Sequence, residues 1–391
     1  MVGPRARVNL STALAYAPYG IIWTFLPIHL RSLNASFLLI SLIYFVPSLL
    51  PPVWGVLLDR IRKGREIILV SSLAQAIGFT CLPFLSTPVQ YVSVVVVMGF
   101  FSASFVPVYA SLATWASQRY GRAIGGFWAF ASLGFGIATI TGGLLYELYG
   151  TTPLFELGAL FGYAGVAAVL FTSKETFYSP AFNVLMDSQG IGRLLRNRRI
   201  AGLCLLSALV IFATSAFNVF FTVYLVNVLR GSKLMAGLAA TGTTSLGALA
   251  YRLVGPLNDN LGRKPVFLAG ALGYVAYFIA IYFIKNIFVV ALLWIIPIYP
   301  LIQSSAAALV SDYTSTGDRG KGLGLLEAAI SIGGGIGPLV GGLIADVSGT
   351  LDSVVIFSLA VALVSVPLSR ILIRDRPVVP PVQTRTKGRS V

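Results

Sequence analysis

The chain is short of charged residues and of residues that bind metals. Charged side chains make up 10% of its 391 residues, whereas a water-soluble protein of this size needs far more to cover its surface. The sequence has two cysteines, Cys81 and Cys204, and one histidine, His29. We therefore expect no metal site and no cofactor, because a metal cluster needs more such ligands. The sequence also has no GxxxxGK phosphate-binding loop, which excludes nucleotide hydrolysis by this chain as an energy source.

Long apolar blocks take up most of the sequence instead. Hydrophobic residues make up 57% of the chain, and the mean hydropathy is +0.86. The blocks are continuous rather than alternating, and each approaches the roughly 20 residues that a membrane-spanning helix needs, which favours helices over a β-barrel. The sequence therefore predicts an all-α membrane protein with twelve transmembrane helices. We expect the spans at about 8–30, 36–58, 66–86, 89–114, 122–147, 153–173, 200–228, 234–257, 266–284, 287–311, 321–346 and 353–373.

The basic residues fall in alternate loops between these spans. Most of the 28 Lys and Arg residues lie near the chain ends and in the even-numbered loops. This positive-inside pattern predicts a multi-pass protein of the cytoplasmic membrane with both termini in the cytoplasm. A net charge of +15 can also indicate nucleic-acid binding, but here the basic residues are not on a soluble face, so we expect the lipid bilayer and no nucleic acid as a partner.

An internal repeat divides the spans into two sets of six. The segment 121–125 resembles 320–324 at an offset of 199 residues, and the glycines of 132–144 recur in 331–343 at the same offset. Because six is even, the two halves have the same orientation, which predicts a pseudo-two-fold axis along the membrane normal. We expect six-helix bundles at 1–173 and 200–375, a cytoplasmic linker at 174–199 and a cytoplasmic basic tail at 376–391.

Two motifs carry a resemblance to the major facilitator superfamily. The run Gly255-Pro-Leu-Asn-Asp-Asn-Leu-Gly-Arg-Lys264 resembles that family's loop motif between its second and third helices, and 55–60 is a first-half copy followed by a longer loop. The eleventh span resembles the family's glycine-proline motif, which is usual in the fifth helix, through Gly337, Pro338, Gly341 and Gly342. Such small residues let helices approach closely, and Pro338 is a candidate hinge. The resemblance implies a transporter that works by alternating access.

The loop motif also predicts a gate at the cytoplasmic side. By the family's pseudo-symmetry, Asp59 would face the start of the eleventh helix near Lys321, and Asp259 would face the fifth helix near Arg122. A carboxylate there meets free N–H groups and the positive end of a helix dipole. We expect these contacts to close the cytoplasmic side in the outward-facing state; the alternative is that both carboxylates are simply solvated. The predicted gate comprises Asp59, Arg60, Arg122, Asp259, Arg263, Lys264 and Lys321.

Acidic residues are rare within the spans. Glu327 lies six residues after Lys321, about 9 Å into the eleventh helix. An ionised acid at that depth is costly, so Glu327 is a candidate proton carrier; the alternative is a carboxylate that reaches the inner interface or pairs with an arginine. Glu147, Glu156 and Asp346 fall near the outer helix ends, where we expect solvated side chains.

The resemblance implies that helices one, four, seven and ten line a central cavity. Their middle turns offer Tyr16, Tyr19, Trp23, Phe101, Phe105, Tyr109, Asn218, Tyr224, Tyr299 and Gln303. Such a lining is aromatic with scattered hydroxyls and amides, which favours an uncharged or amphipathic solute over a phosphate or a dicarboxylate. The fourth helix lacks the arginine that proton-driven drug exporters of this family usually carry.

These observations predict a monomeric secondary transporter of a small molecule, with protons as the candidate coupling ion. Export of an amphipathic compound and uncoupled uptake of a small neutral nutrient both remain open. The alternative from another class is a membrane-embedded enzyme. That alternative is disfavoured because the 13 acidic residues are dispersed rather than clustered.

Overall fold

The computed structural model describes residues 4–61, 63–109, 120–172, 188–315 and 317–373. Every regular element in these ranges is a helix. The first half contains α1 (Pro4–Ser32), α2 (Phe37–Ser48), α3 (Pro51–Ile61), α4 (Gly64–Cys81), the short η1 (Leu82–Phe84), α5 (Pro88–Ser102), α7 (Tyr120–Tyr149) and α8 (Thr151–Leu170). The second half contains α9 (Ser188–Arg196), α10 (Arg198–Asn218), α11 (Phe221–Val223), the π-helical η3 (Tyr224–Val228), α12 (Lys233–Leu261), α13 (Arg263–Phe283), α14 (Ile287–Ile295), α15 (Tyr299–Tyr313), α16 (Arg319–Ser348) and α17 (Leu351–Leu372).

The predicted twelve-helix membrane fold is confirmed. Eleven described segments are long and apolar enough to cross a membrane. The twelfth span is α12, which has 29 residues and is less apolar because it carries several threonines. Their hydroxyls have acceptors, since Thr241 and Thr243 lie 2.9 and 3.1 Å from carbonyls one turn earlier, and Thr241 also lies 2.6 Å from the Thr139 hydroxyl of α7. A threonine bonded in this way is tolerated in a membrane span.

Several spans that the sequence predicts as continuous helices are interrupted. The predicted span 36–58 divides into α2 and α3 just before Pro51 and Pro52, and 287–311 divides into α14 and α15 around Pro297. Proline has no N–H to donate and clashes with the preceding turn, which explains both breaks. The predicted span 200–228 changes from α10 to α11 and ends in the π-helical η3.

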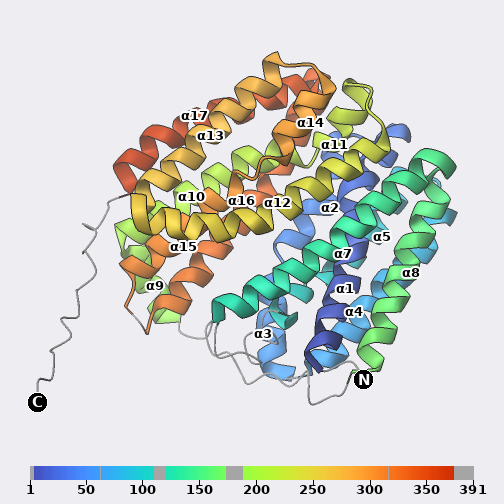
Figure 1. The fold of residues 1–391 in the computed structure, drawn as a ribbon, viewed down its shortest axis with the longest axis horizontal. Helices are drawn as coiled ribbons and strands as arrows, with labels where there is room; N and C mark the ends of the chain where they lie inside the picture. Colours follow the sequence, from blue (N-terminus) through green and yellow to red (C-terminus); the bar gives the residue numbers. More distant parts are fainter. Residues whose placement is uncertain (1–3, 62, 110–119, 173–187, 316, 374–391) are drawn as a thin grey trace, which may run out of the picture.

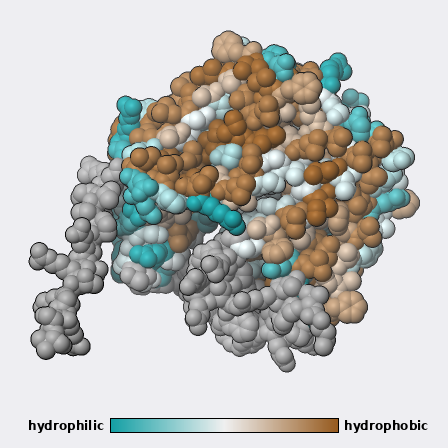
Figure 2. Space-filling view, in the orientation of Figure 1, coloured by the Kyte–Doolittle hydropathy of each residue, from teal (hydrophilic) through white to brown (hydrophobic). Residues whose placement is uncertain are grey.

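Two six-helix bundles lie side by side (Figure 1), with the blue-to-green helices α1–α8 in one and the remaining spans in the other. The helix ends near Pro4, Ile61 and Leu372 lie on one face, which we call the terminal face. The ends near Ser32 and Ser348 lie on the opposite face, which we call the distal face. Figure 2 shows hydrophobic residues across the middle of the visible surface and hydrophilic ones near its edges, as expected for a surface that contacts lipid.

Candidate functional site

The two bundles meet mainly through two helix pairs, α2 with α16 and α7 with α12, and α1 also touches α11 and α12. In the first pair, Gly342 lies so close to α2 that an added Cβ would be 2.7 Å from the carbonyl oxygen of Phe37. One turn further, the Asp346 carboxylate accepts hydrogen bonds from the backbone N–H groups of Phe37 and Leu38, both at 2.8 Å. These N–H groups start α2 and have no acceptor within that helix, so the carboxylate of one bundle caps a helix of the other.

The second pair repeats this arrangement. A Cβ added at Gly143 of α7 would lie 3.1 Å from Leu234 Cα at the start of α12. Glu147 Oε2 accepts a hydrogen bond from the backbone N–H of Lys233 at 2.7 Å. We call the Asp346 and Glu147 contacts the distal clasps, because both lie at the distal face and both join the bundles.

The contacts obey the sequence repeat. Gly143 and Glu147 precede Gly342 and Asp346 by 199 residues, the offset found between the two halves. The glycines are part of the predicted repeat, whereas the sequence reading assigned both carboxylates to solvent. They are indeed exposed, but each also bonds to the opposite bundle. The shared offset of the acids is the signal that could have identified them.

The glycine-proline motif of α16 uses two faces. Gly337 and Gly341 pack on α10 of their own bundle, and a Cβ at Gly337 would lie 2.6 Å from Phe212 O. Gly342 faces α2 of the other bundle, as described above. The helix runs unbroken through Pro338, so the candidate hinge is not a break in this structure.

The predicted gate lies at the terminal face, and the side chains of Asp59 and Arg122 fall outside the described residues. Asp259 and Arg60 are exposed, and within the described residues Asp259 has no hydrogen-bond or ion-pair partner. The other described gate residues have partners in their own bundle: Arg263 Nη1 lies 2.8 Å from Asp312 Oδ2, Lys264 Nζ donates to Arg370 O at 2.9 Å, and Lys321 Nζ lies 3.3 Å from Asp318 Oδ1. The contacts between bundles at this gate stay predictions.

The loop motif contains one residue whose role the sequence reading missed. Asn258 is buried and ties α12 to α15, since Ser305 donates to its Oδ1 at 2.7 Å and its Nδ2 donates to Ser304 at 3.3 Å. Together with the Arg263–Asp312 ion pair, these bonds fix the turn between α12 and α13 on α15.

Most of the predicted cavity residues of the first bundle gather in one aromatic cluster. Tyr16 stacks on Tyr19 with ring centroids 5.4 Å apart, and Tyr19 lies 6.2 Å from Trp23. The hydroxyls of Tyr16 and Tyr109 are buried without a partner in the described part of the chain. Two rings of α7 complete the cluster and were missed by the sequence reading, which considered only four helices. The cluster comprises Tyr16, Tyr19, Trp23, Phe105, Tyr109, Phe127 and Trp128.

Phe101 lies apart from this cluster. Its ring is 6.4 Å from that of Trp54 and 5.3 Å from that of Phe100. It therefore contributes to the packing of the second span on the fourth.

A smaller polar cluster lies in the second bundle around Tyr251 of α12, which the sequence reading did not name. The Tyr251 hydroxyl donates to Gln303 Oε1, and its ring packs edge-on against Tyr299 at 5.8 Å. Glu327 of α16 is exposed. The structure thus brings two predicted residues of α15, Tyr299 and Gln303, together on one residue of the eighth span.

The remaining predicted cavity residues are bonded within their bundle. Asn218 Oδ1 accepts from the Tyr277 hydroxyl at 3.2 Å. Tyr224 is fully buried near the distal face, where Lys285 Nζ lies 2.8 Å from both the Tyr224 hydroxyl and Asp352 Oδ1. This triad holds the end of the seventh span against α17.

Comparison with known proteins identifies the family. The chain matches the model of the Major Facilitator Superfamily over residues 8–229 and 203–390, and it belongs to this family of membrane transporters, whose members are not enzymes. It is 26% identical to "Uncharacterized MFS-type transporter MJ1560" of Methanocaldococcus jannaschii over 88% of this chain and 93% of that protein. It is 24% identical to the "Multidrug resistance protein MdtG" of Salmonella paratyphi A, over 85% of this chain and 86% of that protein.

Solved structures share the fold. A point mutant of the nucleoside transporter NupG superposes with a TM-score of 0.82 at 14% identity, covering 95% of this chain and all (100%) of the other. A bacterial homologue of the human lysosomal transporter Spinster, in an inward-facing and occupied conformation, gives a TM-score of 0.75 at 16% identity, covering 95% and 97%.

Proposed function

We propose that this secondary transporter carries a small uncharged or amphipathic solute across the cytoplasmic membrane by alternating access. The observation that carries this proposal is the position of the contacts between bundles, which lie along α2 and in the distal halves of α7, α12 and α16. A transporter of this kind closes one side of a central site while the other side is open.

The terminal halves of the same helices support this view. α2 packs along α16, whereas α3, the terminal half of the same span, packs on α4. In Figure 1 the distal ends of α7 and α12 lie close together and their terminal ends lie apart. On the charge distribution we place the terminal face, with both chain ends, in the cytoplasm, so that this conformation is inward-facing.

The two side-chain clusters support the choice of solute. Seven aromatic rings pack together in the first bundle, of which Trp23 and Trp128 are each 47% exposed, and the Tyr251–Gln303 pair in the second bundle offers hydrogen-bonding groups. The relatives named as multidrug resistance proteins favour export of amphipathic compounds. Uncoupled uptake of a small neutral nutrient is the second candidate, which the hydrogen-bonding groups of the polar cluster favour.

Glu327 is our candidate for proton coupling. It is the single acid of α16 between its first turn and Asp346, and it forms no ion pair with any described residue. If this carboxylate takes up a proton, the loss of its charge would favour one conformation of the transporter over the other.

Transport in proteoliposomes tests both candidates. We would measure movement of a lipophilic dye and of a neutral nucleoside, each with and without a pH gradient. We expect the dye to move against its concentration gradient when a pH gradient is present. Nucleoside uptake at the same rate with and without the pH gradient would favour the second candidate. If neither the proton-driven nor the passive assay showed transport of any tested solute by folded protein, the proposed solute class would be wrong. Labelling of the C-terminal tail from the outside of intact cells would refute the orientation.

A further inference from the structure

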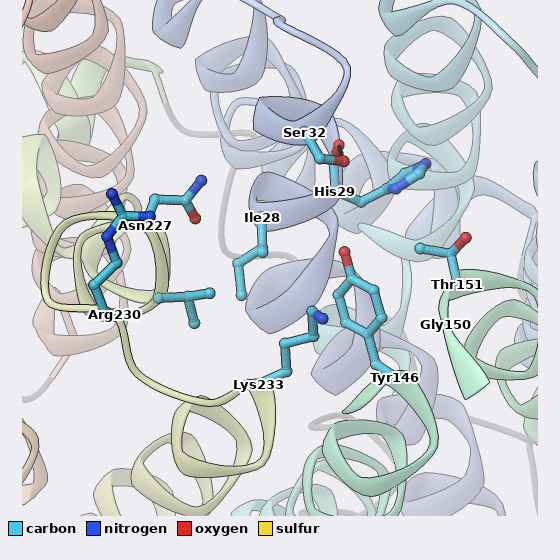
Figure 3. A pocket seen from close by; sticks show the side chains of 10 residues that line it. Ile28, His29, Ser32, Tyr146, Gly150, Thr151, Asn227, Arg230 and Lys233 are labelled. Atoms are coloured by element: carbon cyan, nitrogen blue, oxygen red, sulfur yellow. Dashed lines mark hydrogen bonds between the residues drawn. The ribbon is translucent and has the colours of Figure 1, made fainter. Parts of the chain in front are cut away.

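A cavity remains between the bundles at the distal face, where the clasps hold them together (Figure 3). Its volume is about 540 Å³. The first bundle contributes the end of α1 and the junction of α7 with α8, and the second contributes the end of the seventh span and the start of α12. The lining residues are Ile28, His29, Ser32, Tyr146, Gly150, Thr151, Val226, Asn227, Arg230 and Lys233.

The charge of this lining has one sign. Arg230 and Lys233 both line the cavity, and no carboxylate does. The acid next to Lys233 is Glu147, which is occupied by the backbone N–H of that residue at 2.7 Å, while the ammonium lies over the Tyr146 ring at 4.7 Å. Neither cation has an ion-pair partner among the described residues. Glu147 keeps its negative charge beside Lys233, so two cations three residues apart face a single acid, and the surplus positive charge attracts an anion.

The backbone places Arg230 firmly. Its φ of 62° lies in the left-handed region, which is unfavourable for an arginine. The turn is fixed on both sides, because Leu229 N–H donates to Tyr224 O at 3.0 Å and Gly231 N–H donates to Leu225 O at 2.9 Å. The guanidinium therefore projects from an ordered turn and not from a frayed chain end.

The opposite wall offers neutral polar groups from the first bundle. The hydroxyls of Ser32, Tyr146 and Thr151 line it, together with the His29 ring. His29 lines the cavity, but its Nε2 is buried away from the cavity space and has no hydrogen-bond partner among the described residues. Its ring lies edge-on to Tyr91 at 4.9 Å, which fixes its position. The groups of this wall that can face a solute are therefore the neutral hydroxyls, which can donate hydrogen bonds to it.

We propose that this cavity binds an anion of the phosphate or carboxylate type, held by the two cations of the second bundle and by hydroxyls of the first. Because its walls belong to different bundles, the site exists only while the distal face is closed. The bound anion therefore favours the closed distal face and slows the return to the opposite state. This consequence rests on the proposed alternating access, whereas binding itself does not. A free phosphate and an anionic lipid head group share the required chemistry.

The test uses the full chain with both native cysteines replaced and spin labels at Val89 and Phe288, which start α5 and α14 at the distal face. Two measurements are made in phosphatidylcholine nanodiscs: the midpoint of thermal unfolding and the distance between the labels. Inorganic phosphate replaces chloride at constant ionic strength in one arm, and phosphatidylglycerol is added in the other. A response in the first arm identifies a free anion, and a response confined to the second identifies a lipid head group.

We expect the anion to raise the unfolding midpoint and to enrich the short label distance. Arg230→Asn, which keeps a residue that tolerates the left-handed turn, should weaken the apparent affinity about tenfold. Arg31→Gln is the matched control, since Arg31 is a distal-face cation that does not line the cavity. The proposal is overturned if neither arm moves the midpoint, or if Arg230→Asn responds like the unmodified protein. A midpoint that rises through Arg230 while the label distance stays constant supports the site and refutes its link to alternating access.

Discussion

Replacing Asp346 by Asn removes the charge from one distal clasp and is expected to shift the protein toward the state in which the distal face is open. The carboxylate accepts two backbone hydrogen bonds across the bundle interface, both at 2.8 Å. Bonds of this charge-assisted kind contribute about 1.5–3 kcal/mol each when shielded from water. Asp346 is exposed, so screening by solvent lowers this contribution, and we assign about 1–2 kcal/mol to the charge as a whole. A difference of this size changes the ratio of the two states by about 5- to 30-fold.

The assay is the distance between spin labels at Val89 and Phe288, measured in nanodiscs free of anionic lipid. Asp346→Asn should enlarge the long-distance population, and Glu147→Gln should do so less, because Glu147 accepts one described backbone bond across the interface. Glu156→Gln is the matched control, since this acid also lies near the distal face but has no described hydrogen bond. If Asp346→Asn changed the distance distribution no more than Glu156→Gln, the clasp would have no role in closing the distal face.

Three further predictions concern the contact between α2 and α16, the candidate proton carrier and the predicted cytoplasmic gate. Gly342→Ala places a methyl group 2.7 Å from a backbone carbonyl of α2, so it should separate α2 from α16 and increase labelling of the distal face, whereas Gly324→Ala, with open space around it, should not. Glu327→Gln should abolish solute accumulation driven by a pH gradient but leave exchange of solute intact; accumulation at the normal level would show that Glu327 carries no coupling proton. Asp259→Ala should slow transport more than it weakens solute binding, and an unchanged rate at normal expression would argue against the cytoplasmic gate.

The fold could be predicted from the sequence because the membrane imposes a simple rule. Apolar blocks of the required length and an alternation of basic loops suffice to place twelve spans, and even the less apolar α12 is found between two well-defined neighbours. Pro51 and Pro297 mark the two interruptions in the sequence. Hydropathy alone predicts continuous helices there, because it takes no account of the N–H groups that prolines lack. The π-helical end of the seventh span has no comparable signal in the sequence.

The site was predicted less completely, and the distal clasps show why. An acid at a helix end is usually solvated, and only the 199-residue repeat that pairs Asp346 with Glu147 distinguishes it from Glu156, whose counterpart is Val355. Its partners are backbone N–H groups of α2, which every sequence would supply, so no complementary side chain marks the contact. The aromatic cluster was easier, since Tyr16, Tyr19 and Trp23 are spaced to share one side of α1, but the rings of α7 that complete it come from a helix not expected to line the cleft.

The distal clasps are weak enough for the distal face to open again in every transport cycle. Each clasp uses an exposed carboxylate and one or two backbone bonds, so the pair together favours the closed distal face by only a few kcal/mol on the estimate above. Moving a two-state equilibrium from one side to the other requires a differential binding energy of about 5.5 kcal/mol. A solute in the cleft, a proton on Glu327 or loss of an anion from the distal cavity could each supply part of this energy. Buried ion pairs in the same positions would fix the closed state far more strongly, and their absence from the described interface agrees with a gate that opens reversibly.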